Sequence, residues 1–131
     1  MIELTLPWPP SVNSMWRTPR SGPLAGRTLL SEEGRRYRKE VDAAVLRQGR
    51  PAIGTARVAI DIEVRMPDRR RRDLDNLPKA VLDALTHAAV WDDDSQIDDL
   101  RVWRSERDGG VLVVRLRALP QAQGDLLEGA A

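Results

Sequence analysis

Acidic and basic side chains adjoin in one short segment of the sequence. The basic part is a run of four arginines: Arg69, Arg70, Arg71 and Arg72. Asp73 and Asp75 follow directly, and in an extended segment their carboxylates point to the same side, where they can share a divalent cation. Arginines attract phosphate. The segment therefore predicts a site that holds a cation beside a phosphate-bearing ligand.

A lysine and a second acidic run follow within twenty residues. Lys79 is one of two lysines beside nineteen arginines, which favours a role as a compact point charge on a phosphate. Asp83, four residues further on, is in position to pair with it. The second acidic run comprises Asp92, Asp93 and Asp94. If the intervening helix packs on a sheet, a third carboxylate returns toward the first two, and the three hold one or two Mg²⁺ ions for metal-assisted hydrolysis.

Each of these features also has a plainer interpretation. Asp73 and Asp75 can be a helix cap and a surface acid, and the arginine run can be a solvated face. The run of Asp92, Asp93 and Asp94 can be a solvated turn, although it lacks the spacing of an EF-hand.

Composition excludes several other kinds of site. The 131 residues contain no cysteine, which excludes disulfides and thiolate metal sites, and only one histidine, His87, which argues against a multi-histidine zinc site or a histidine-based catalytic pair within one chain. A metal must then be held by oxygen ligands, which favours Mg²⁺, Mn²⁺ or Ca²⁺. Neither a signal peptide nor a membrane-length apolar run is evident, so we expect a cytoplasmic protein with no membrane contact.

The hydrophobic pattern predicts the elements that position these residues. Strands are expected over 2–6 and 58–66, and a long loop over 11–30. One helix is expected from the cap Ser31 to about residue 47, and another over 77–89 that begins at Pro78 with Asp75 or Asn76 as its cap.

The remaining residues predict two more strands and a tail. Residues 100–106 and 111–119 are expected to form a hairpin turned by Asp108-Gly109-Gly110. The order β-loop-α-β-α-β-β predicts a single α/β domain of the α+β type over 1–120, with a small mixed sheet and two main helices. Residues 121–131 are expected to be a disordered tail.

Beyond these local patterns, the sequence resembles the RusA family of Holliday junction resolvases from its first strand to its last. The matching segments, in order, are Leu6–Asn13, Gly26–Thr28, Ser31–Arg38, Met66–Lys79, Asp83–Leu85 and Trp91–Gln96. The resemblance implies a homodimer that binds four-way junction DNA and nicks two opposed strands symmetrically, with Mg²⁺ as cofactor and Mn²⁺ as a substitute.

The resemblance also implies roles for individual residues. The family's essential acids fall on Asp73, Asp75 and Asp94, and its essential lysine falls on Lys79. Asp92 departs from the family pattern, which has an apolar or variable residue there. Asp93 therefore stays beside Asp94 as a candidate for the third metal ligand. We expect the four arginines to bind DNA.

Two other classes of protein compete with a junction nuclease. A non-catalytic, basic nucleic-acid-binding module accounts for the arginines through phosphate contacts, but not for the acids beside them. A small metal-binding interaction domain with oxygen ligands accounts for the acids, but leaves Lys79 and the arginines unexplained.

Overall fold

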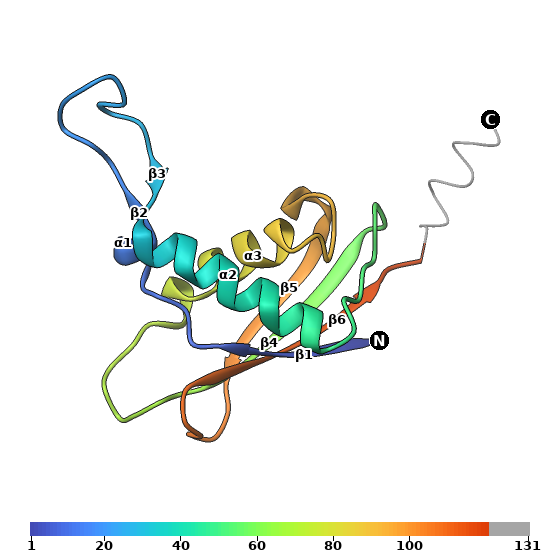
Figure 1. Cartoon of the computed structure of the whole chain (residues 1–131). Helices are drawn as coiled ribbons and strands as arrows, with labels where there is room; N and C mark the ends of the chain where they lie inside the picture. The colour runs from blue at the N-terminus through green and yellow to red at the C-terminus, as the bar shows by residue number, and fades with distance from the viewer. Residues whose placement is uncertain (121–131) are drawn as a thin grey trace, which may run out of the picture.

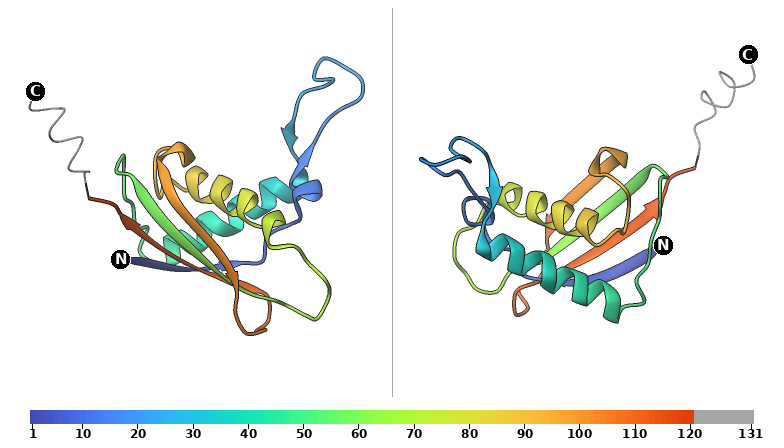
Figure 2. Two further views of the ribbon diagram at one scale, coloured as in Figure 1. Left: turned by 180° about the vertical axis from the view of Figure 1, so that it is seen from behind. Right: turned by 45° about the horizontal axis from the view of Figure 1, so that its top comes forward.

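Two helices cover one face of a four-stranded mixed sheet (Figures 1 and 2). The structure, a computed structural model, describes residues 1–120. The strands follow the spatial order β1-β6-β4-β5, with bounds Ile2–Pro7 (β1), Val58–Arg65 (β4), Ile97–Arg104 (β5) and Val111–Ala118 (β6). The helices are α2, Glu32–Arg47, and α3, Pro78–His87. The α/β prediction of one domain with a mixed sheet and two main helices is thereby confirmed, whereas the predicted tail, 121–131, lies outside the described residues.

Alternation along β4 decides which face of the sheet carries the core. Val58, Ile60, Ile62 and Val64 are almost fully buried under the helices. Residues of α2 at helical spacing, among them Tyr37, pack onto them, and Ser31 begins that helix by accepting a hydrogen bond from the Gly34 amide at 2.9 Å. The predicted start and end of this helix are both confirmed. No helix in the described part of the chain is long and apolar enough to cross a membrane.

The predicted hairpin of the last two strands is wrong. β5 pairs in parallel with β4, and β6 pairs antiparallel on the other side of β4, so β4 separates them. The Asp108-Gly109-Gly110 turn is present, but its loop passes across the end of β4. There the Asp108 amide donates to the Met66 carbonyl at 3.2 Å, and a Cβ on Gly110 would lie 2.7 Å from Pro67. The glycine turn specifies that the chain reverses direction, but it does not specify whether another strand, here β4, lies between the two strands that it connects.

The segment predicted as a long loop contains three short elements. They are α1 (Val12–Met15), β2 (Trp16–Arg17) and β3 (Leu29–Leu30). β2 and β3 pair antiparallel, and the residues between them project from the body of the protein (Figures 1 and 2).

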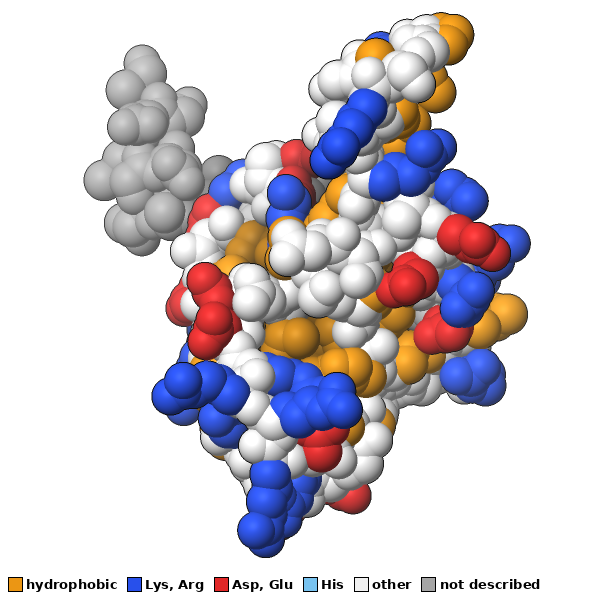
Figure 3. Space-filling model, turned by 90° about the vertical axis from the view of Figure 1, so that its left-hand side faces the viewer, with side chains coloured by type: hydrophobic (Ala, Val, Ile, Leu, Met, Phe, Trp, Pro, Cys, Tyr) orange, Lys and Arg blue, Asp and Glu red, His pale blue; other side chains and the backbone are white. Residues whose placement is uncertain are grey.

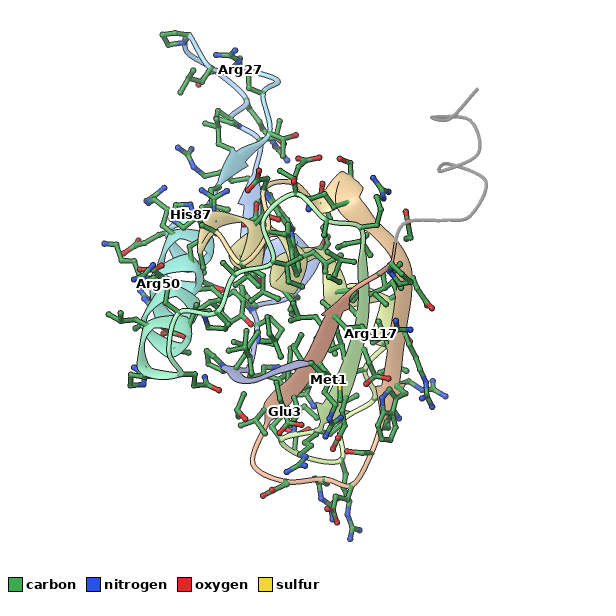
Figure 4. The ribbon with its side chains drawn as sticks, turned by 90° about the vertical axis from the view of Figure 1, so that its right-hand side faces the viewer. Met1, Glu3, Arg27, Arg50, His87 and Arg117 are labelled. Atoms are coloured by element: carbon green, nitrogen blue, oxygen red, sulfur yellow. The ribbon has the colours of Figure 1, made fainter. Side chains whose placement is uncertain are left out.

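The second face of the sheet carries charged side chains that neutralise one another. Glu63 is only 6% exposed and accepts hydrogen bonds from Arg65 at 2.8 Å, Ser105 at 2.9 Å and Arg115 at 3.0 Å. Arg115 also reaches Glu3 on β1 at 2.9 Å, so the cluster links strands across the sheet. In Figure 4 Glu3 lies on this sheet beside Met1.

This cluster predicts a loss of stability in acid. The contact with Arg65, followed by those with Ser105 and Arg115, lowers the pKa of Glu63 from 4.5 to about 2. A lowered pKa stabilises the fold above pH 4.5, and that stabilisation is lost as the pH falls from 4.5 toward 2. Glu63→Gln should lower the free energy of unfolding at pH 7 by roughly 1–3 kcal/mol and flatten its decline below pH 4.5. Urea unfolding from pH 7 to pH 3 checks this, and parallel pH profiles of both proteins would contradict it.

Candidate active site

A cleft of about 310 Å³ lies where the N-terminal strand and the start of α3 meet. Its walls are formed by Trp8, Pro9, Ser11, Arg71, Arg72, Asp73, Asn76 and Leu77. Figure 3 faces this end of the molecule and shows lysine and arginine side chains gathered there. The cleft thus joins the arginine run and the first predicted carboxylate to a segment about sixty residues away in the sequence.

Asp73 and Asp75 lie in a different backbone conformation from the one predicted. Asp73 is extended, but Asp75 lies in a 3-10 turn, η1 (Leu74–Asn76), so the two are not on one extended segment. The predicted cap was also wrong, because α3 begins after Leu77 without a side-chain cap, although Pro78 does occupy its first turn. Both aspartates are exposed, and neither carboxylate is hydrogen-bonded to another described side chain or amide. Their oxygens are therefore free for a ligand.

Arg72 differs from the three arginines before it. Arg69, Arg70 and Arg71 are exposed, whereas the half-buried Arg72 forms an ion pair with Asp68 and stacks over the Trp8 ring at 5.5 Å. The Arg72 guanidinium, with the Arg70 amide, lowers the pKa of Asp68 to about 2. Asp68 therefore shapes the arginine loop, and Arg72 forms a wall of the cleft that retains its charge.

Lys79 is held by an aromatic ring. Its Nζ lies 4.8 Å from the centre of the Trp16 ring, a cation–π contact that orients the ammonium group. The predicted pairing of Lys79 with Asp83 was wrong, because Asp83 accepts two hydrogen bonds from Arg38 of α2, at 2.9 and 3.0 Å. Trp8 and Trp16 thus support cations of the site. Their sequence positions gave no sign of this, since neither lies near its arginine or lysine in the chain.

The second acidic run is fixed by a buried glutamine that sequence inspection missed. The Gln96 carboxamide accepts hydrogen bonds from the amides of Asp92 and Asp93, at 2.9 and 2.8 Å. It donates to the carbonyls of Gly54 and Ala56, both at 2.7 Å. Its only sequence signal is the spacing Asp93-x-x-Gln96, a capping box at the start of the 3-10 turn η2 (Asp94–Gln96).

The aspartates of this run have different hydrogen-bonding roles. The Asp93 carboxylate accepts from the Ser95 hydroxyl and from the Ser95 amide at 3.1 Å, contacts that lower its pKa. Asp92 and Asp94 are exposed, and no described side chain or amide bonds their carboxylates.

One chain does not bring the two acidic groups together. η1 precedes α3 and η2 follows it, so Asp75 and Asp94 lie at opposite ends of a ten-residue helix, about 15 Å long (Figure 1). Within residues 1–120, no three aspartate, glutamate or histidine side chains lie close enough to share a metal ion.

Comparison with known proteins shows the family to which the sequence is similar. The family model described as Endodeoxyribonuclease RusA matches residues 7–117. The chain is 53% identical over 101 residues to the crossover junction endodeoxyribonuclease RusA of Escherichia coli K12, covering 76% of this chain and 79% of that protein. The proteins of the same name from Enterobacteria phage 82 and Shigella sonnei are 53% and 52% identical, with the same coverage.

The role of Gln96 can be tested by stability. Gln96→Leu removes four hydrogen bonds of a buried side chain and leaves the Asp93 amide and the Ala56 carbonyl without these partners, whereas the Asp92 amide still donates to the Gly54 carbonyl at 3.3 Å. We therefore expect a loss of roughly 2–3 kcal/mol in the free energy of unfolding. Gln48→Leu is the matched control, because Gln48 also bonds backbone groups, those of Thr5, but at an exposed position. It should cost less than about 1 kcal/mol. Equal losses in urea unfolding would show that Gln96 does not organise the acidic loop.

Proposed function

This chain belongs to the RusA family of endodeoxyribonucleases, and we propose that it resolves Holliday junctions by Mg²⁺-dependent hydrolysis of two opposed strands. Family membership implies a divalent metal cofactor in general; Mg²⁺, the paired symmetric nicks and the homodimer are our proposals. The observation that supports this function best is a cleft lined by the unbonded Asp73 carboxylate and by Arg72, next to a turn and helix start that carry the exposed Asp75 and Lys79.

The residues around the cleft suit a phosphodiester substrate. Asp73 and Asp75 present unbonded oxygens, the ligands that Mg²⁺ prefers. When bound, Mg²⁺ lowers the pKa of a coordinated water and offsets charge on the phosphate. Lys79, oriented by Trp16, supplies a positive charge to the scissile phosphate, and the exposed Arg69, Arg70 and Arg71 bind the neighbouring backbone with Arg72.

Hydrogen bonding favours Asp94 over Asp93 as the third metal ligand. The Asp93 carboxylate already caps η2 through Ser95, and using it as a ligand would break that cap. Asp94 is held by the same turn and has a free carboxylate. The oxygen-ligand set of the proposed site is therefore Asp73, Asp75 and Asp94, with Asp93 as its support.

A site with all three acids requires two chains. α3 holds Asp73 and Asp75 at one end and Asp94 at the other, and a packed helix cannot shorten to join them. In a two-fold dimer, the end of α3 in one chain can lie beside the beginning of α3 in its partner. We therefore infer that each active site combines Asp73 and Asp75 of one chain with the partner's Asp94.

The free edge of β5 provides a surface for such a dimer. β5 is an outer strand, and because the Ser105 amide donates to Val64 of β4, the alternation leaves the backbone groups of Leu100 and Val102 facing away from the sheet. Leu100 is 44% exposed, which is unusual for a leucine on an unpaired edge.

The charges along this edge favour an antiparallel copy. β5 has Asp98 and Asp99 near its start and Arg101 and Arg104 toward its end, so antiparallel pairing around Leu100 places Asp99 of one chain opposite Arg101 of the other. The Arg104 end of β5 lies next to the active-site segment, since Arg104 donates to the Arg72 carbonyl at 2.7 Å. That pairing would bring the partner's η2 toward Asp73.

Loss of one metal ligand should separate cleavage from binding. Asp75→Asn preserves side-chain size but removes a negative charge, so junction cleavage at saturating enzyme should fall by about two orders of magnitude or more. Junction binding in EDTA should persist or tighten slightly, because an acid near DNA is lost. Asp92→Asn is the control, with little effect on cleavage. Near wild-type cleavage by Asp75→Asn would contradict the nuclease site argued here and favour a binding module.

A mixed dimer tests whether the site spans two chains. Chains with Asp75→Asn and Asp94→Asn, carrying different tags and purified through both, should regain cleavage that neither variant has alone. Each mixed dimer then has one intact site of two. It should nick only one strand of a junction, and its total nicking rate should be about half that of the wild-type dimer. If the mixed dimer stays inactive, the three acids do not combine across chains. Failure to recover any doubly tagged dimer would contradict the homodimer itself.

A further inference from the structure

The segment between β2 and β3 forms a projecting arm, residues 16–30. It is ordered by its own backbone: the Gly26 amide donates to the Pro19 carbonyl at 3.0 Å and the Arg27 amide to the Leu24 carbonyl at 3.1 Å. Residues 20–28 are all exposed, and Figures 1 and 2 show the arm extending away from the sheet and helices. The arm is thus a built structure with almost no packing on its own protein.

The base of the arm is anchored tightly. The Ser31 amide donates to the Met15 carbonyl at 2.9 Å, and the Ser31 hydroxyl to the same carbonyl at 3.0 Å. At Gly34 a Cβ would lie 2.4 Å from that carbonyl, so α2 approaches the arm as closely as a glycine allows. The direction of the arm is therefore set by the body of the protein.

The charge of the arm has one sign. Between Glu3 and Glu32 the only charged residues are Arg17, Arg20 and Arg27, and all three are exposed. None of them forms an ion pair within residues 1–120, whereas Arg65, Arg101 and Arg115 of the four-stranded sheet do. A basic, acid-free surface is what the phosphate backbone of a nucleic acid requires.

The arm also has an apolar tip. Pro23 and Leu24 lie at its end, and Leu24 is 41% exposed, one of four large apolar side chains so exposed in the described chain. Figure 3 shows hydrophobic side chains at the end of the arm and basic ones toward its base. Proteins that distort DNA insert such apolar side chains where bases are unstacked.

The arm begins at the proposed catalytic site. The ring of Trp16, its first residue, lies against the Lys79 ammonium group in the first turn of α3. The arm therefore extends outward from the end of α3 that follows Asp73 and Asp75. Five or six residues on each side give it a reach of roughly 15–20 Å.

We propose that this arm is a second DNA-binding surface that selects branched over linear DNA, an inference that rests on the proposed function. Arg17, Arg20 and Arg27 hold the phosphates of one duplex arm of the junction. Leu24 contacts the bases that are unstacked at the branch point. The arm thereby adds affinity for a junction that a linear duplex cannot obtain.

Binding measurements in EDTA, where no cleavage occurs, test the arm apart from catalysis. Arg20→Ala/Arg27→Ala should lower the slope of log affinity against log salt by about 1.8 for a four-way junction, because each lost phosphate contact removes about 0.9. Arg47→Ala/Arg50→Ala removes the same charge at the far end of α2, about 24 Å along that helix, and should leave the slope unchanged. Figure 4 shows the separation of Arg27 from Arg50.

Leu24→Ser tests the tip. It should leave the salt slope unchanged and reduce the ratio of junction to linear-duplex affinity about tenfold, by removing the apolar contact. Thermal unfolding should be unaltered in all these variants, because the changed side chains are exposed. An unchanged slope in Arg20→Ala/Arg27→Ala, or an unchanged ratio in Leu24→Ser, overturns the proposal. Absence of junction binding by the wild-type protein would instead contradict the proposed function.

Discussion

Parallel pairing of β4 and β5 obliges the chain to return along the whole length of the sheet before β5 can begin, and α3 makes that return. The separation of the two acidic groups of the candidate site depends on this arrangement. Residues at the end of β4 and residues before β5 are close in the sequence but lie at opposite ends of the helix. The two acidic groups therefore cannot share a cation in one chain, although fewer than twenty residues separate Asp75 from Asp94.

Around this frame, charges fall into two groups that have different partners. Asp68, Asp83 and Asp93 are bound by protein groups and hold the arginine loop, the two helices and the η2 turn in place. Asp73, Asp75 and Asp94 are left without such partners. A carboxylate that is both exposed and unbonded has its oxygens available to a cation. Three such carboxylates brought together would repel one another unless a cation lay between them. Trp16 holds Lys79 without neutralising it, as a carboxylate partner would, whereas Arg72 contacts both the Trp8 ring and the Asp68 carboxylate.

Sequence predicted those features that depend on neighbouring residues. Ser31 and the spacing of Tyr37 and Val41 defined α2, and the alternation from Val58 defined β4, because capping and periodicity act within a few residues. Strand order failed, since the glycine turn after Asp108 does not encode that β4 lies between β5 and β6. Lys79 was assigned the wrong partner for the same reason: Asp83 is one helical turn away, but Arg38 from α2 reaches it with two hydrogen bonds. The supporting roles of Trp8, Trp16 and Gln96 arise from contacts between distant segments, and no local pattern could reveal them.

The proposed two-chain site would determine how the two cuts in a junction are paired. If each site takes Asp73 and Asp75 from one chain and its third acid from the other, a single chain on DNA has no complete metal site and cannot nick. Dimer formation then supplies two complete sites at once, related by the two-fold axis, which matches the symmetry of a four-way junction. In that proposal, the helix that separates the acids in one chain is also what makes hydrolysis depend on a partner. The ten residues of α3 set the distance between Asp75 and Asp94 within one chain, and so the distance between the two active sites to which that chain would contribute.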